Sequence, residues 1–127
     1  MMDSNNTLSF RMIFLKGKVD LEKSEKNIIS PEIVKQKWEL TSFKKREISN
    51  MIVFKSVNNI KEIIIILFFD KYHSVRNHSL NEELKNLGVL LGVVWEEIKI
   101  LNKNEAIEIL QKLSSNDYLR ETLEYPK

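Results

Sequence analysis

The sequence predicts an all-α protein, a single helical bundle of five or six helices, on three observations. Short polar side chains recur at spacings typical of helix starts. Leucines and other apolar residues repeat every 3.5 residues over positions 80–101. The chain has 3 glycines and 2 prolines, few for a fold that needs many tight turns. The alternative is an α+β fold with strands drawn from residues 8–21 and 52–69.

The 127 residues fit one domain, and we find no linker or internal repeat that divides it. Residues 1–28 are the hardest segment to assign. One set of side chains there has helical spacing: Leu8, Met12, Leu15 and Val19. Another set alternates as in a strand: Phe10, Met12 and Phe14.

Four positions have the character of helix starts. Ser30 precedes Pro31, which suits the first position of a helix. The other three combine a short polar residue with a glutamate three positions later, the spacing of a capping box. These pairs are Asn59 with Glu62, Ser79 with Glu82, and Asn102 with Glu105.

The apolar run 63–69 is compatible with two structures. Its helical stripe, together with the cap at Asn59, favours a helix in the middle of the bundle. Four successive isoleucines favour a strand instead, because branching at Cβ suits a pleated surface. On that view residues 52–57 and 60–69 form a hairpin across Asn58 and Asn59.

A long amphipathic helix is predicted over residues 80–101. Its seam consists of Leu80, Leu84, Leu87, Leu91, Val94, Ile98 and Leu101. Gly88 and Gly92 lie beside the seam and allow another helix to approach closely, within the chain or in a dimer. With Val93 and Trp95 they form the predicted interface. A short helix is predicted over 116–127.

The residues indicate no catalytic, cofactor or metal site. There is no cysteine, no glycine-rich phosphate loop and no nucleophile motif. His73 and His78 lie five positions apart, so one helix face cannot present both. A metal centre needs three or four convergent ligands, which these histidines do not supply.

A basic segment over residues 35–46 is the candidate for nucleic-acid contact, through Lys37, Lys44, Lys45 and Arg46. Trp38 and Phe43 lie among these cations. On a helical wheel the charges are spread around the helix, which is typical of a solvated surface.

The segment HSLNEELKNLG, from His78, and the segment DYLRETLEYP, from Asp117, resemble parts of HEPN domains over residues 43–126. The resemblance implies a helical bundle that pairs with itself or with another protein. Ribonucleases of that family carry an arginine followed, after four to six residues, by a histidine. No arginine of this chain precedes a histidine at that spacing, so the resemblance implies no nuclease site.

The formal net charge of +2 is below that of a dedicated nucleic-acid binder. We expect a non-catalytic protein-interaction module, homodimeric or bound to another protein, with nucleic-acid association as the alternative. No apolar run approaches a membrane span, and no signal peptide is recognised at the N-terminus. A cytoplasmic protein is therefore expected.

Overall fold

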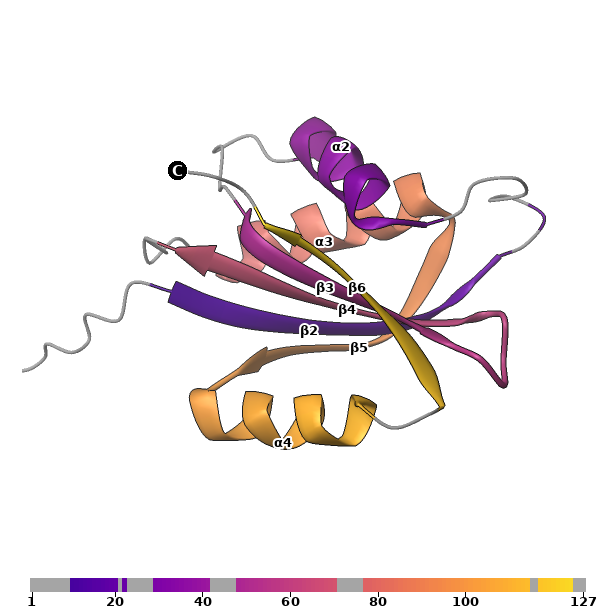
Figure 1. Ribbon diagram of the computed structural model, residues 1–127. Coiled ribbons are helices and arrows are strands. Elements are labelled where there is room, and N and C mark those ends of the chain that lie inside the picture. The colour runs from indigo at the N-terminus through magenta and orange to yellow at the C-terminus, as the bar shows by residue number, and fades with distance from the viewer. Residues whose placement is uncertain are drawn as a thin grey trace, which may run out of the picture.

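The computed structural model describes residues 10–20, 22, 29–41, 48–70, 77–114 and 117–124, with the backbone alone for 10, 11, 70 and 77–79. Five strands and three helices occupy these ranges (Figure 1). In chain order they are β2 (Phe10–Val19), α2 (Pro31–Thr41), β3 (Ile48–Ser56), β4 (Glu62–Asp70), α3 (Asn77–Leu91), β5 (Val93–Leu101), α4 (Lys103–Leu113) and β6 (Tyr118–Glu124).

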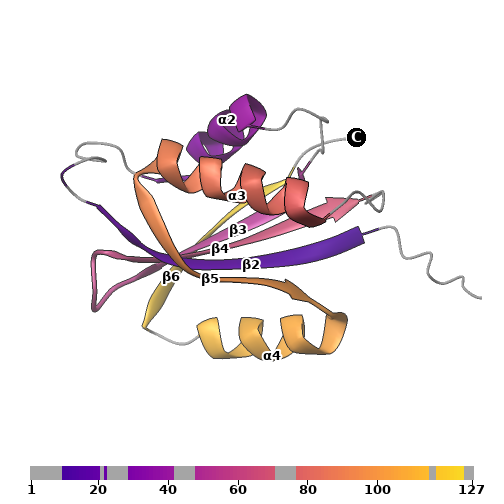
Figure 2. The ribbon, with the colours of Figure 1, turned by 180° about the vertical axis from the view of Figure 1, so that it is seen from behind.

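The strands form one sheet in the order β5-β2-β4-β3-β6, and every neighbouring pair is antiparallel. The first four strands with α2 and α3 follow the split β-α-β arrangement, in which β4 lies between β2 and β3. Helices α2 and α3 lie on one face of the sheet and α4 on the other (Figures 1 and 2). After α4, the chain returns to add β6 beside β3.

The predicted all-α bundle is therefore wrong, and the α+β alternative gives the right fold class but only three of the five strands. Strand β2 lies within residues 8–21, and β3 and β4 form the hairpin across Asn58 and Asn59. Asn59 belongs to the hairpin turn, where its side chain accepts a hydrogen bond from the Lys61 amide at 3.0 Å. The helical bundle that the HEPN resemblance implies likewise differs from this sheet.

The isoleucine run forms a strand because helices cover both faces of the sheet. Successive residues of β4 point to opposite faces, so a strand buried on both sides is apolar at every position. On the α2 and α3 face the first core contains Ile63, Ile65, Leu67 and Phe69. On the α4 face the second core contains Ile64 and Ile66.

The predicted helix over 80–101 is also wrong in its second half. Helix α3 ends at Leu91, and Gly92 has a φ of 73°, the left-handed conformation that commonly follows a helix end. Strand β5 then begins at Val93. The leucines of the seam that lie within α3 are buried against the sheet, whereas Val94 is 68% exposed.

Two of the predicted helix starts are confirmed. The Ser30 hydroxyl accepts a hydrogen bond from the Ile33 amide at 3.3 Å, and α2 begins at Pro31. Asn102 and Glu105 form the reciprocal capping box of α4. Ser79 instead lies inside α3, which begins at Asn77. The helix predicted for the tail is wrong, because residues 118–124 form β6.

Candidate functional site

Helix α3 runs directly into β5 (Figure 2), and the four predicted interface residues belong to the end of α3, the turn and the start of β5. Gly88 lies so close to β5 that a Cβ atom there would be 2.6 Å from the Trp95 Nε1 atom and 2.9 Å from the Val93 carbonyl oxygen. Trp95 donates a hydrogen bond from Nε1 to the Leu84 carbonyl at 2.8 Å. Val93 is 6% exposed. Gly88, Val93 and Trp95 thus hold α3 against β5 within one chain, and Gly92 makes the turn.

Apolar side chains of α3 and β5 are nevertheless exposed. We call them, together with the outer edge of β5, the β5 surface. Its apolar members are Val89 (78% exposed), Leu90 (40%), Val94 (68%) and Ile100 (42%). Strand β5 ends the sheet, and within the described residues no strand pairs with its outer edge. The sequence signal for this surface is Gly92 followed by two β-branched valines, which ends a helix and begins a strand.

Of the four predicted nucleic-acid contact residues, the structure describes one. Lys37 lies on α2 and is half-buried. Lys44, Lys45 and Arg46 lie outside the described residues, as does His73. The backbone of His78 lies in the first turn of α3. Contact between residues 35–46 and a nucleic acid therefore stays a prediction.

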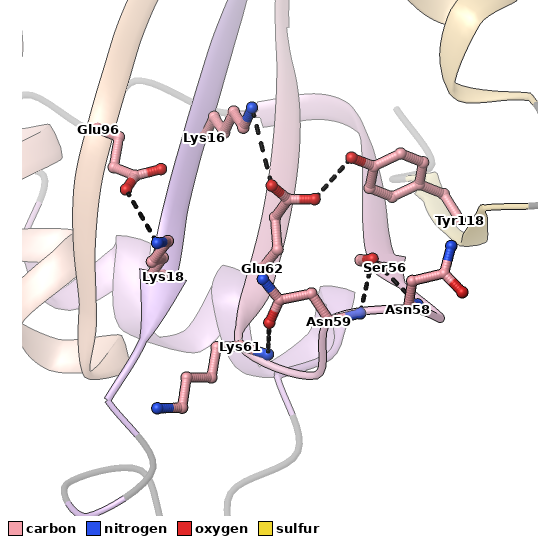
Figure 3. A network of polar contacts seen from close by, with 9 residues as sticks. All are labelled: Lys16, Lys18, Ser56, Asn58, Asn59, Lys61, Glu62, Glu96 and Tyr118. Atoms are coloured by element: carbon pink, nitrogen blue, oxygen red, sulfur yellow. Dashed lines mark hydrogen bonds and ion pairs between the residues drawn. The ribbon is translucent and has the colours of Figure 1, made fainter.

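A polar cluster occupies the α4 face of the sheet near the β3–β4 hairpin (Figure 3). The Tyr118 hydroxyl donates a hydrogen bond to Glu62 Oε1 at 2.6 Å. The other carboxylate oxygen of Glu62 lies 3.8 Å from Lys16 Nζ. Three strands thus contribute one side chain each: β2, β4 and β6. Lys18 and Glu96 form a second, more exposed ion pair at 3.8 Å.

The hairpin turn beside the cluster is held by its own polar side chains. The Ser56 hydroxyl accepts hydrogen bonds from the amides of Asn58, at 3.2 Å, and Asn59, at 3.0 Å. Asn58 Nδ2 donates to Asp117 Oδ1 at 3.0 Å, and the Val57 amide donates to the Asp117 carbonyl at 2.9 Å. These contacts fix the start of β6 against the turn.

The electrostatics of the cluster favour a structural role. The hydrogen bond to Glu62 raises the pKa of Tyr118 from 10.0 to about 12, with further contributions from burial and from the negative charges of Glu62 and Asp117. The phenol therefore stays protonated at neutral pH and acts as a hydrogen-bond donor. A general base or nucleophile at this position would need a lowered pKa instead. The arrangement fastens β6 to the sheet.

Potential metal ligands do not gather in the described part of the chain, where no three His, Cys, Asp or Glu side chains come together. No helix among the described residues is both long and apolar enough to cross a membrane. No protein-family model matches the chain, and no curated protein or solved structure is significantly similar to it.

Proposed function

We propose that this protein is a non-catalytic protein-interaction module that works as a homodimer through its β5 surface. The observation that carries the proposal is the outer edge of β5, which is unpaired among the described residues and lies on a strand that also carries the exposed Val94 and Ile100. An unpaired strand edge adds backbone groups that can bind another strand.

The edge favours a second copy of this chain as its partner. Glu97 and Lys99 stand two residues apart on β5, and their side chains lie 3.2 Å apart while remaining about half exposed. Antiparallel pairing of two identical edges can place each of these charges opposite its counter-charge. Closed twofold dimers are also the commonest assemblies of soluble proteins.

The experiment is sedimentation velocity at micromolar concentration on the wild-type protein and on the variant Ile100→Asp. The wild type should sediment as a dimer of 15.0 kDa chains. The variant should be monomeric, because it places a carboxylate on the strand edge that the second copy covers. Ile100 is 42% exposed within the chain, so the circular dichroism spectrum should not change.

Leu119→Asp is the matched control, since Leu119 is 61% exposed on β6, at the opposite edge of the sheet. This variant should remain dimeric. A wild-type species of one chain mass, unchanged by dilution, would overturn the proposal. Binding of labelled nucleic acid with a steep salt dependence would instead favour the basic segment 35–46.

A further inference from the structure

The charges of β5 restrict how two copies can pair. In the register with β2, Glu97 lies opposite Lys16 and Lys99 lies opposite Phe14. Phe14 belongs to the core under α4, so both charges project on the α4 face of the sheet. Ile98 lies opposite Leu15 and packs against the core on the α2 and α3 face. For the two sheets to join with both faces continuous, residues directly opposite each other on the two β5 strands must project on the same face.

The register shift between Lys16 and Gly17 leaves Glu96 without a partner on β2, so the alternation is regular over residues 97–101. Three neighbouring twofold registers are centred in this segment, and they differ in their charges. With the axis at residue 97, Glu97 meets Glu97 of the second copy. With the axis at residue 99, Lys99 meets Lys99. With the axis at Ile98, Glu97 meets Lys99 twice, once on each side of the axis. Opposite charges directly across an antiparallel pair stabilise it, and like charges destabilise it.

We propose that two copies join through their β5 edges about a twofold axis at Ile98, so that two five-stranded sheets form one continuous ten-stranded sheet. The inference rests on the proposed function and adds the register and the residues that select it. Each Glu97 exchanges its ion pair with Lys99 of its own strand for one with Lys99 of the second copy. Because both pairs are exposed, they select the register more than they supply affinity.

The first test places a single cysteine on β5, which is straightforward because the chain has none. Ile98→Cys puts the two thiols directly opposite each other, about 5 Å apart between Cβ atoms, close to the spacing of a disulfide. Mild oxidation should give a covalent dimer on a non-reducing gel. Ile100→Cys is the matched control, since it lies on the same face but its two copies are about 14 Å apart. It should not cross-link.

The second test reverses the charges. Lys99→Glu or Glu97→Lys alone makes both cross-strand pairs repulsive and should raise the dimer dissociation constant roughly tenfold or more. The combined Glu97→Lys/Lys99→Glu protein restores two attractive pairs and should dimerise like the wild type. Equal amounts of the two single variants should form a mixed dimer, visible by native mass spectrometry after giving one variant a mass tag.

The outcomes separate the register from the proposed function. A monomeric wild-type protein would contradict both the proposed register and the proposed homodimer. A wild-type dimer that does not cross-link through Ile98→Cys and is unaffected by either single charge reversal would overturn this register but leave the homodimer standing on another surface. Cross-linking of Ile98→Cys together with recovery in the charge-swapped protein would support both.

Discussion

Replacing Tyr118 with phenylalanine tests how β6 is attached to the sheet. The substitution removes the hydroxyl that donates to Glu62 at 2.6 Å and leaves the partly buried ring packed against the core under α4. The rise in the pKa of Tyr118 from 10.0 to about 12 corresponds to about 2.7 kcal/mol between its protonation states. Because the ring is partly exposed, water moderates this figure. We expect a loss of about 1–2 kcal/mol in the free energy of unfolding at pH 7.

The pH dependence of this difference in unfolding free energy is a stricter test than its value at pH 7. A group whose pKa is raised in the folded state stabilises that state below its unfolded pKa, and the stabilisation is lost as pH rises through the folded pKa. The stability difference between wild type and Tyr118→Phe should therefore be constant up to about pH 9. It should fall between pH 10 and 12, by roughly 1 kcal/mol at pH 11. Other titrating groups are common to both proteins and cancel in the difference.

Urea titrations followed by tryptophan fluorescence at several pH values measure this difference. Glu62→Gln provides the matched background, because it keeps an acceptor oxygen but removes the charge. There the cost of Tyr118→Phe should fall to about 1 kcal/mol or less. A stability difference that stays the same from pH 8 to pH 11 would refute the reasoning. It would mean that the pKa of Tyr118 is not raised in the folded state and that the hydrogen bond to Glu62 does not form.

Three further substitutions test the fold by urea denaturation. Leu87→Ala, at a fully buried seam position, should lose about 2–5 kcal/mol, and a neutral result would mean that α3 does not pack on the sheet. Gly92→Ala should lose about 1–2 kcal/mol because alanine disfavours the φ of 73°; unchanged stability would argue against a helix end there. Asn102→Ala removes the capping box of α4 and should lose about 1 kcal/mol, whereas a loss near zero would show that this cap contributes little.

Local signals predicted the helix starts that depend on neighbouring residues. Pro31 after Ser30, and Glu105 after Asn102, act through contacts within three or four positions, which a sequence displays directly. The buried leucines of α3 were also predictable, since their spacing belongs to one helix. The end of that helix was missed because Val94, Ile98 and Leu101 continue the 3.5-residue spacing by coincidence into a strand.

The isoleucine run could not be assigned from its own residues. Whether such a segment is a helix or a strand depends on what covers it, and here the covers are helices from distant parts of the chain. The polar cluster was hidden for the same reason. Lys16, Glu62 and Tyr118 are separated by 46 and 56 positions, and only the strand order brings them together. No spacing in the sequence encodes that contact.

The charged side chains of the edge strand β5 affect which other strands can pair with it. Charges on an edge strand discourage indiscriminate pairing with other strands, since most partners leave them without a counter-charge. An edge bearing Glu97 and Lys99 on one face can still pair with an identical edge in the register proposed above, whereas the two neighbouring registers bring like charges together. Ile98 at the axis and the exposed Ile100, on the opposite face from these charges, add apolar area that a lone charged edge lacks. The same residues can therefore exclude unrelated strands and admit a second copy, because specificity needs repulsion of wrong partners as well as attraction of the right one.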